Sequence, residues 1–296
     1  MPDSFAATPP DDPPDRVEPP GLYIVATPIG NLGDLSPRAA RILAQAALIA
    51  AEDTRVTARL LAHIGARVPM QPYHDHNADA VRPMLLERLR NEVIALVSDA
   101  GTPLISDPGY KLVRDARAAG LNVVTVPGPC AVIAALTVAA LPTDRFLFAG
   151  FLPVKAAARA AAIDEVAGIR ATLVFYESAG RTAATLAALA LRLGDRPAAV
   201  ARELTKKFEE TVTGSLGELH VRYATAPPRG EVVIVVGPPL AAAMPAAETL
   251  DDALARAMAG RPLKEAVADV AAGLGMPRKA VYARALALRD GAAHGG

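Results

Sequence analysis

The residues of this chain that are suited to chemistry lie in short polar loops that follow apolar runs. Residues 97–109 come directly after the apolar run 93–96, and there two prolines and two glycines stand among serines and aspartates. Loops of similar composition, 26–31 and 126–129, follow two other predicted strands. Because ligands of α/β sheets bind beyond the carboxyl ends of the strands, three such loops predict a pocket lined largely by backbone groups.

Several common catalytic motifs are absent from the sequence. It has no G-x-G-x-x-G after the first predicted strand, no G-x-x-x-x-G-K-[ST] and no G-x-S-x-G, which argues against a dinucleotide site, a P-loop and a serine hydrolase. The histidines lack the helical H-x-x-x-H spacing of metal ligands, and one cysteine cannot form a thiolate site. His74 and His76 are the nearest pair, and a pair without a metal is the simpler interpretation. No metal site is predicted.

The composition describes a soluble globular protein that is not a general nucleic-acid binder. The chain has 296 residues, 52% of them hydrophobic, and its formal net charge is zero. A broad basic field is therefore excluded, although a local basic patch is not. The single cysteine, Cys130, and a start without a secretory signal pattern predict a cytoplasmic protein. Residues 118–143 carry no charge, but Pro127 and Pro129 break this run, so we expect a strand and a buried helix and no membrane span.

The hydrophobic pattern divides the chain into four parts. Residues 1–20 contain seven prolines and are expected to be a disordered tail. Strands and helices alternate over 21–142, which predicts an α/β lobe with a largely parallel sheet, and 143–238 read as a mixed α+β lobe. Residues 248–290 predict a small helical domain whose cations, Arg278, Lys279, Arg284 and Arg289, are more simply interpreted as a solvated helix face than as an RNA-binding surface.

A series of motifs resembles one known family. In chain order these are YIVATPIGNLGDLSPRA, AEDTR, YHDHN, VSDAGTPLISDPGY, VPGP, LPTDRFLFAGFLP, TLVFYES, ARELTKKFEE and GEVVIVV. Together they are similar to the ribosomal RNA small subunit methyltransferase I family, within the tetrapyrrole methylase superfamily, over roughly residues 21–290. The resemblance implies a two-lobed α/β class III methyltransferase fold and a homodimer. It also implies S-adenosylmethionine as cofactor and 2′-O-methylation of a cytidine ribose in the decoding region of 16S rRNA, in the small ribosomal subunit.

The resemblance also implies which residues contact the cofactor. Two departures from the family pattern stand close to them: Cys130 where a serine is common, and Ser178-Ala179-Gly180 where a Pro-His pair is common. A thiol is a weak hydrogen-bond donor, so Cys130 is expected to pack and not to bind. The predicted cofactor-binding residues are Pro28, Ser98, Asp99, Ala100, Gly101, Thr102, Leu104, Ile105, Ser106, Pro127, Phe175, Tyr176, Glu177, Leu204, Gly230, Glu231 and Val232.

Methyl transfer to a ribose hydroxyl also requires loss of a proton. Asp99, Glu177 and Glu203 are candidate bases because each lies near a predicted strand end, although a capping or ion-pair role is the simpler interpretation of any one of them. Cations near the same loops are candidates for holding RNA phosphates. They are Arg55, Arg202, Lys206 and Lys207.

Two other functions stay open from the sequence. One is a methyltransferase that uses the same cofactor and lobes on a tetrapyrrole such as a precorrin or uroporphyrinogen. The other is a non-catalytic ribosome-binding protein that keeps the fold without turnover. Binding of S-adenosylmethionine separates the second from the two enzymes, and the choice of acceptor separates the enzymes.

Overall fold

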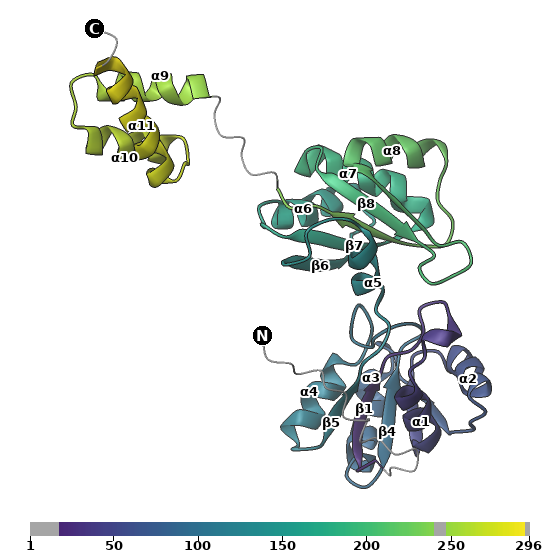
Figure 1. Cartoon of the computed structure of the whole chain (residues 1–296). Helices are drawn as coiled ribbons and strands as arrows, with labels where there is room; N and C mark the ends of the chain where they lie inside the picture. The colour runs from purple at the N-terminus through teal and green to yellow at the C-terminus, as the bar shows by residue number, and fades with distance from the viewer. Residues whose placement is uncertain (1–17, 240–246, 294–296) are drawn as a thin grey trace, which may run out of the picture. The chain divides into compact units, whose positions relative to one another are not determined.

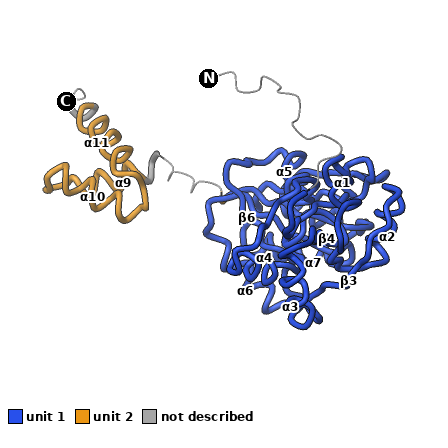
Figure 2. Tube along the Cα trace, turned by 90° about the horizontal axis from the view of Figure 1, so that it is seen from below, with its two compact units in different colours: residues 1–238 blue, residues 239–296 orange. Residues whose placement is uncertain are grey.

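The structure is a computed structural model that describes residues 18–239 and 247–293. The chain divides into two compact units, 1–238 and 239–296 (Figure 2). Each unit is described by itself below. In the described residues, no helix is long and apolar enough to cross a membrane.

The first lobe is built on a sheet in which all strands run parallel. The strand order is β3-β2-β4-β1-β5. Parallel neighbours need crossover connections, and here helices supply most of them. In chain order the elements are β1 (Gly21–Val25), η1 (Leu32–Asp34), α1 (Pro37–Gln45), β2 (Leu48–Ala51), α2 (Thr54–His63), β3 (Met70–Pro72), α3 (Ala78–Arg88), β4 (Val93–Val97), α4 (Tyr110–Ala118) and β5 (Val123–Val126).

Helices cover both faces of this sheet, and this explains why its central strands are apolar on both sides. On one face Tyr23 and Val25 of β1 pack with buried residues of α1 and α2, and on the other Leu22 packs with buried residues of α3 and α4 (Figure 1). The arrangement brings the loops after β1, β4 and β5 to the same edge of the sheet.

The second lobe has a mixed sheet with the order β6-β7-β10-β8-β9. Only β6 and β7 are parallel, while β10 is antiparallel to β7 and to β8, and β8 is antiparallel to β9. The elements are α5 (Ala131–Val138), β6 (Phe146–Phe151), α6 (Ala156–Ala167), β7 (Thr172–Ser178), η2 (Ala179–Arg181), α7 (Thr182–Leu193), β8 (Pro197–Arg202), β9 (Glu210–Ser215), α8 (Leu216–Thr225) and β10 (Glu231–Val236).

The faces of the second sheet are covered differently. Leu173 and Phe175 of β7 pack in a core with α6, α7 and α8, whereas Val174 and Tyr176 pack with α5. The helix α5 follows β5 of the first lobe in the chain and packs on β10 of the second. It therefore connects the two lobes. Together the two lobes confirm the predicted α/β fold class.

The second unit consists of α9 (Ala247–Met258), α10 (Leu263–Gly273) and α11 (Arg278–Ala293). Leu254, Val267 and Val281, one from each helix, are almost fully buried against one another. This matches the helical domain expected at the end of the chain.

The tail expected over 1–20 lies mostly outside the described residues. Its last part is described: Glu18 is only 6% exposed. The Glu18 carboxylate accepts hydrogen bonds from Tyr23 Oη at 3.3 Å and from Arg41 Nη2 at 3.2 Å. Residues just before β1 are thus held on the first lobe.

Candidate functional site

Hydrogen bonds join the three strand-end loops of the first lobe. Thr27 and Gly101 exchange two backbone hydrogen bonds, N to O at 2.8 and 3.0 Å, between the loops after β1 and β4. Thr102 Oγ1 donates to the carbonyl oxygen of Pro129, at 2.9 Å, in the loop after β5. Gly101 has a φ of +82°, and a Cβ there would lie 3.2 Å from Ile29 Cγ2. The loops therefore form one continuous, closely packed wall.

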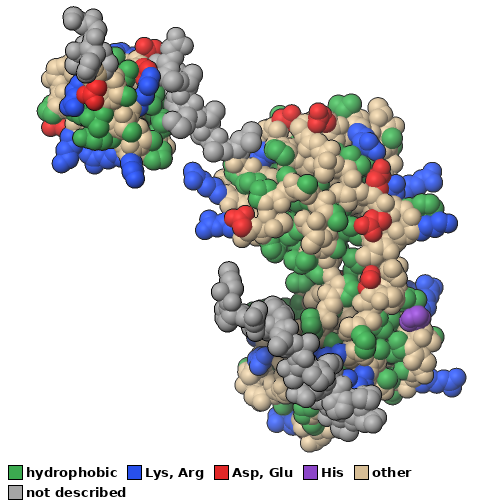
Figure 3. Space-filling view, in the orientation of Figure 1, with side chains coloured by type: hydrophobic (Ala, Val, Ile, Leu, Met, Phe, Trp, Pro, Cys, Tyr) green, Lys and Arg blue, Asp and Glu red, His purple; other side chains and the backbone are tan. Residues whose placement is uncertain are grey.

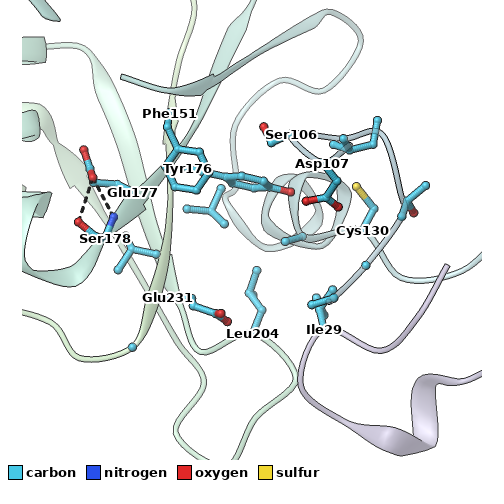
Figure 4. Close-up of a pocket in the computed structure, with 18 residues that line it drawn as sticks. Ile29, Ser106, Asp107, Cys130, Phe151, Tyr176, Glu177, Ser178, Leu204 and Glu231 are labelled. Carbon is cyan, nitrogen blue, oxygen red and sulfur yellow. Dashed lines mark hydrogen bonds between the residues drawn. The ribbon is translucent and has the colours of Figure 1, made fainter. Parts of the chain in front are cut away.

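A cavity of about 380 Å³ lies between this wall and the second lobe (Figure 4). The second lobe contributes residues from the end of β6, the end of β7, the loop after β8 and the start of β10. Its lining residues are Ile29, Ala100, Gly101, Thr102, Ile105, Ser106, Asp107, Cys130, Ala131, Phe151, Tyr176, Glu177, Ser178, Leu204, Gly230, Glu231, Val232 and Val233.

Tyr176 forms the aromatic side of the cavity. Its ring makes edge contacts with Phe148 and Phe151, with centroids 4.7 and 5.4 Å apart. Burial raises the pKa of the Tyr176 hydroxyl, and the nearby Cys130 and Asp107 raise it further, so the phenol is neutral at physiological pH. In Figure 4 the ring lies across the cavity with its hydroxyl toward Asp107.

Asp107 directs its carboxylate toward the Tyr176 hydroxyl in Figure 4, whereas the carboxylate of Glu231, which also lines the cavity, is paired with Lys206. Burial raises its pKa, as does Asp99, while a hydrogen bond from Ser98 acts in the opposite direction. A half-buried carboxylate among apolar groups favours a cationic partner. The site can therefore hold a ligand that carries positive charge and has apolar surface to bury.

A second cavity adjoins the first, on the other side of Ile29 and Ala100. It is lined by the β1 loop, α2 and the β4 loop, and from the second lobe by Lys206 and Glu231. Lys206 Nζ donates to Glu231 Oε2 at 2.8 Å and to Glu203 Oε1 at 3.1 Å. Glu231 borders both cavities, so this ion pair stands where they meet.

Most of the expected cofactor residues come together. Three of them, Pro28, Ser98 and Asp99, line the second cavity instead. Pro127 and Leu104 are not among the described residues that line either one. The residues that line the first cavity are Ala100, Gly101, Thr102, Ile105, Ser106, Tyr176, Glu177, Leu204, Gly230, Glu231 and Val232.

The structure corrects the prediction that the Phe175 side chain contacts the cofactor. Successive side chains of a strand point to opposite faces, so Phe175 lies opposite Tyr176. It is fully buried in the core with α6, α7 and α8. Its ring therefore packs the lobe and does not reach a ligand.

The structure also corrects the prediction that Glu177 is a candidate base. It lines the cavity, but Figure 4 shows its side chain turned away from the centre. Its carboxylate accepts from Thr185 Oγ1 at 2.6 Å and from the Ser178 amide at 2.8 Å, and it pairs with Arg181 at 3.3 Å. The side chain is 0% exposed. Glu177 thus holds the end of β7 in place and cannot meet a substrate proton.

Glu203 is likewise engaged within its own loop. It accepts from the Glu231 amide and from Lys206 Nζ, both at 3.1 Å, and these bonds lower its pKa. It is not among the described residues that line either cavity. Asp99 borders the second cavity, and its Oδ1 accepts from the Asp53 amide at 3.0 Å.

The four cations expected to bind RNA are not equivalent. Arg55 pairs with Asp53 at 2.6 Å, and Arg202 pairs with Glu210 at 2.7 Å. Lys206 lines the second cavity, whereas Lys207 is exposed with its Nζ 5.6 Å from the centroid of Phe208. Arg55 belongs to the first lobe and the other three to the second. Of these four cations, Lys206 alone lines one of the two cavities.

Asp107, Phe151 and Cys130 line the cavity but were absent from the expected ligand contacts. Asp107 stands in the same loop as the predicted residues, so its place in SDPG after β4 was an available signal. Cys130 precedes α5 without capping it through its side chain. In the described part of the chain, no group of three His, Cys, Asp or Glu residues is arranged to hold a metal ion.

Comparison with known proteins adds two family matches. A model of tetrapyrrole (corrin/porphyrin) methylases matches residues 21–220, and a model of the RsmI C-terminal HTH domain matches residues 243–289. The solved structure of uroporphyrin-III-C-methyltransferase from Thermus thermophilus is similar with a TM-score of 0.53 and 22% identity, over 73% of this chain and 93% of that one. Diphthine synthase is similar with a TM-score of 0.57 and 15% identity, over 73% and 89%. These likenesses concern the fold.

Sequence relatives are much closer. The ribosomal RNA small subunit methyltransferase I of Mesorhizobium japonicum is 47% identical over 95% of this chain and 97% of its own length. The protein of the same name from Pseudomonas aeruginosa is 46% identical over 90% and 96%. The chain therefore belongs to the tetrapyrrole methylase family and, within it, to the ribosomal RNA small subunit methyltransferase I group.

Proposed function

We propose that this protein transfers a methyl group from S-adenosylmethionine to the ribose 2′-oxygen of one cytidine in the decoding region of 16S rRNA. The observation that carries the proposal is the cavity between the lobes, which the loops after β1, β4 and β5 build together with the second lobe. Those relatives are named for the small-subunit rRNA. A T. thermophilus uroporphyrin-III C-methyltransferase of the same fold was solved with S-adenyl homocysteine.

The residues of the first cavity fit such a methyl donor. Its volume of about 380 Å³ lies in the range of roughly 300–1,000 Å³ usual for small-molecule sites. Ile29, Leu204 and Val232 offer apolar surface to an adenine ring, and Gly101 lets the backbone approach closely. Asp107 faces this space with a carboxylate that suits the positive charges of the donor. The donor supplies an electrophilic methyl group on a sulfonium.

We assign the acceptor nucleotide to the second cavity. There Lys206 can contact a phosphate, and Asp99 borders the space where a ribose hydroxyl would have to lose its proton. In the transfer, the 2′-oxygen forms a bond to the methyl carbon, the carbon–sulfur bond breaks with its electrons left on sulfur, and the proton passes to Asp99. Positioning of two reactants supplies up to ~7–11 kcal/mol of such a barrier, so the packed loops are expected to contribute most of the rate.

The direct test uses labelled S-adenosylmethionine with small ribosomal subunits that lack the modification. The label should appear in the ribose of one cytidine. The RNA chain should resist alkaline hydrolysis at that nucleotide, because its 2′-oxygen is methylated. Uroporphyrinogen offered in parallel tests the tetrapyrrole alternative, and calorimetry with the donor tests the non-catalytic one. No transfer to subunits or to naked rRNA, together with transfer to uroporphyrinogen, would overturn the assignment.

We further propose a homodimer that works in the cytoplasm. The edge strand β6 and the neighbouring α5 expose Phe146, Ile133 and Val138 to 44%, 48% and 42%. An edge strand beside an apolar patch is a surface that proteins normally cover. Sedimentation should give twice the chain mass, and Phe146→Glu with Ile133→Glu should yield monomers; a wild-type monomer at micromolar concentration contradicts this.

A further inference from the structure

The cations of the helical unit are not distributed evenly. Of those described there, Arg284 pairs with Asp251 at 2.5 Å, Arg261 with Asp269 at 3.1 Å, and Arg289 contacts its neighbour Asp290. In contrast, Lys264, Arg278 and Lys279 are exposed, and no carboxylate of the described residues lies within ion-pair distance of them. Arg256 is the one other described cation of this unit without an ion pair, and it donates to the carbonyl oxygen of Asp252.

The same three cations line one hollow. Together with Leu263 and Tyr282 they surround a surface cavity of about 560 Å³. Arg278 Nη2 donates to the carbonyl oxygen of Lys264 at 3.4 Å, which joins the first turn of α11 to the first turn of α10. Figure 3 shows Lys and Arg side chains gathered along one edge of this unit.

The backbone explains why this face is presented outward. α10 and α11 are joined by the four residues 274–277, with Gly275 at a φ of +62°, which is the turn of a helix-turn-helix. Val281 of α11 is fully buried in the core of the unit, whereas its neighbour Tyr282 is 43% exposed. In this motif, the first residues of the second helix are those that reach a nucleic acid.

We propose that Lys264, Arg278, Lys279 and Tyr282, which we call the α10–α11 surface, bind RNA separately from the cavity between the lobes. The three cations contact phosphates, and the tyrosine ring stacks on an unpaired base. The position of Arg278, Lys279 and Tyr282 at the start of the second helix of this motif favours a nucleic acid over an acidic protein or a membrane surface. The identity of the RNA rests on the proposed function, because rRNA is the substrate assigned above.

The test compares matched full-length variants that each lose two positive charges from the same unit. Arg278→Gln with Lys279→Gln alters the α10–α11 surface. Arg256→Gln with Arg289→Gln is the control, because neither residue lines the hollow of the α10–α11 surface. Fluorescence anisotropy with an RNA hairpin of the decoding-region sequence measures affinity over a range of salt concentrations, and circular dichroism checks folding.

The surface variant should bind the hairpin about tenfold or more weakly, and its affinity should depend less steeply on salt, by roughly one to two in log–log slope. The control should stay within about twofold of the wild type. Tyr282→Leu should weaken binding without changing the salt slope. Equal affinities of surface variant and control overturn the proposal, as would tighter binding of a DNA hairpin or of anionic vesicles than of RNA.

Methyl transfer is measured on the same proteins, so that the two proposals can fail separately. The surface variant should show a raised KM for small subunits with kcat unchanged, because the cavity between the lobes is intact. If the wild type transfers no methyl group, the proposed function fails, but the anisotropy results still decide whether the α10–α11 surface binds RNA.

Discussion

Thr102 donates its hydroxyl hydrogen bond to the carbonyl oxygen of Pro129 at 2.9 Å, and this bond connects the β4 loop to the loop that leads into α5. Thr102 lines the first cavity, and α5 packs on the second lobe. A single side chain therefore couples the donor site to the helix that joins the lobes.

Thr102→Val keeps the side-chain shape and removes the hydroxyl. A hydrogen bond of this type contributes about 1 kcal/mol, so affinity for S-adenosylmethionine should fall roughly fivefold. Calorimetry measures the affinity, and Thr102→Ser, which retains the hydroxyl, serves as the control. Unchanged affinity in the valine variant would mean that the loop is held by its backbone bonds alone.

Asp107→Asn should make the protein more stable at neutral pH but weaken donor binding. Because burial holds the pKa of Asp107 above 3.8, ionisation costs the folded state more than the unfolded state, and this cost appears as pH rises through that range. The wild type should therefore lose stability relative to the variant as the pH rises above 3.8. Urea unfolding from acidic to neutral pH is the measurement, and Asp144→Asn, which removes one exposed carboxylate, is the control.

Glu177 and Asp99 should respond differently to removal of charge. Glu177→Gln should keep kcat within a few fold, because the carboxylate contacts Thr185, Ser178 and Arg181 and faces no substrate. Glu177→Ala should instead lower the free energy of unfolding by about 1–3 kcal/mol, since the buried Thr185 hydroxyl and the Ser178 amide lose their acceptor.

Asp99→Asn should lower kcat by about 10² or more if this residue accepts the proton. Single-turnover transfer and chemical denaturation separate the two effects. A large fall in kcat for Glu177→Gln with normal stability would restore Glu177 as a base.

The strands of the first lobe could be predicted well from the sequence, because the patterns that indicate them are local. Apolar runs of four or five residues alternate with helical patterns, and both faces of the sheet are covered, so β1, β2, β4 and β5 appear at the expected positions. The three loops at the strand ends follow from the rule for parallel sheets. β9 begins only at Glu210, because the Glu209 amide donates to the Lys206 carbonyl and the chain is still in a turn there.

The placement of Phe151 could not be read from the sequence. Side chains three residues apart in a regular strand point to opposite faces, yet Phe148 and Phe151 both contact Tyr176. The register between β6 and β7 shifts between Phe148 and Phe151, and Gly150 there has a φ of +64°. The bulge turns the Phe151 side chain into the cavity, and the hydrophobic pattern of the sequence does not predict a bulge there. Glu177 was misassigned for a related reason, since only the packed lobe brings Thr185 to its carboxylate.

Lys206→Met should separate acceptor binding from donor binding. Lys206 lines the second cavity and is the only expected RNA-binding cation built into the site, although in the absence of substrate its Nζ is shared by Glu231 and Glu203. Removing the charge should raise KM for small subunits about tenfold, since one charged contact contributes up to ~1–2 kcal/mol. The Kd for S-adenosylmethionine should stay within about twofold.

Lys207→Met, one residue away and exposed, is the matched control and should change neither quantity. If both variants raise KM for small subunits equally, the loop attracts RNA through its overall positive charge. The assignment of the acceptor nucleotide to the second cavity then loses its support.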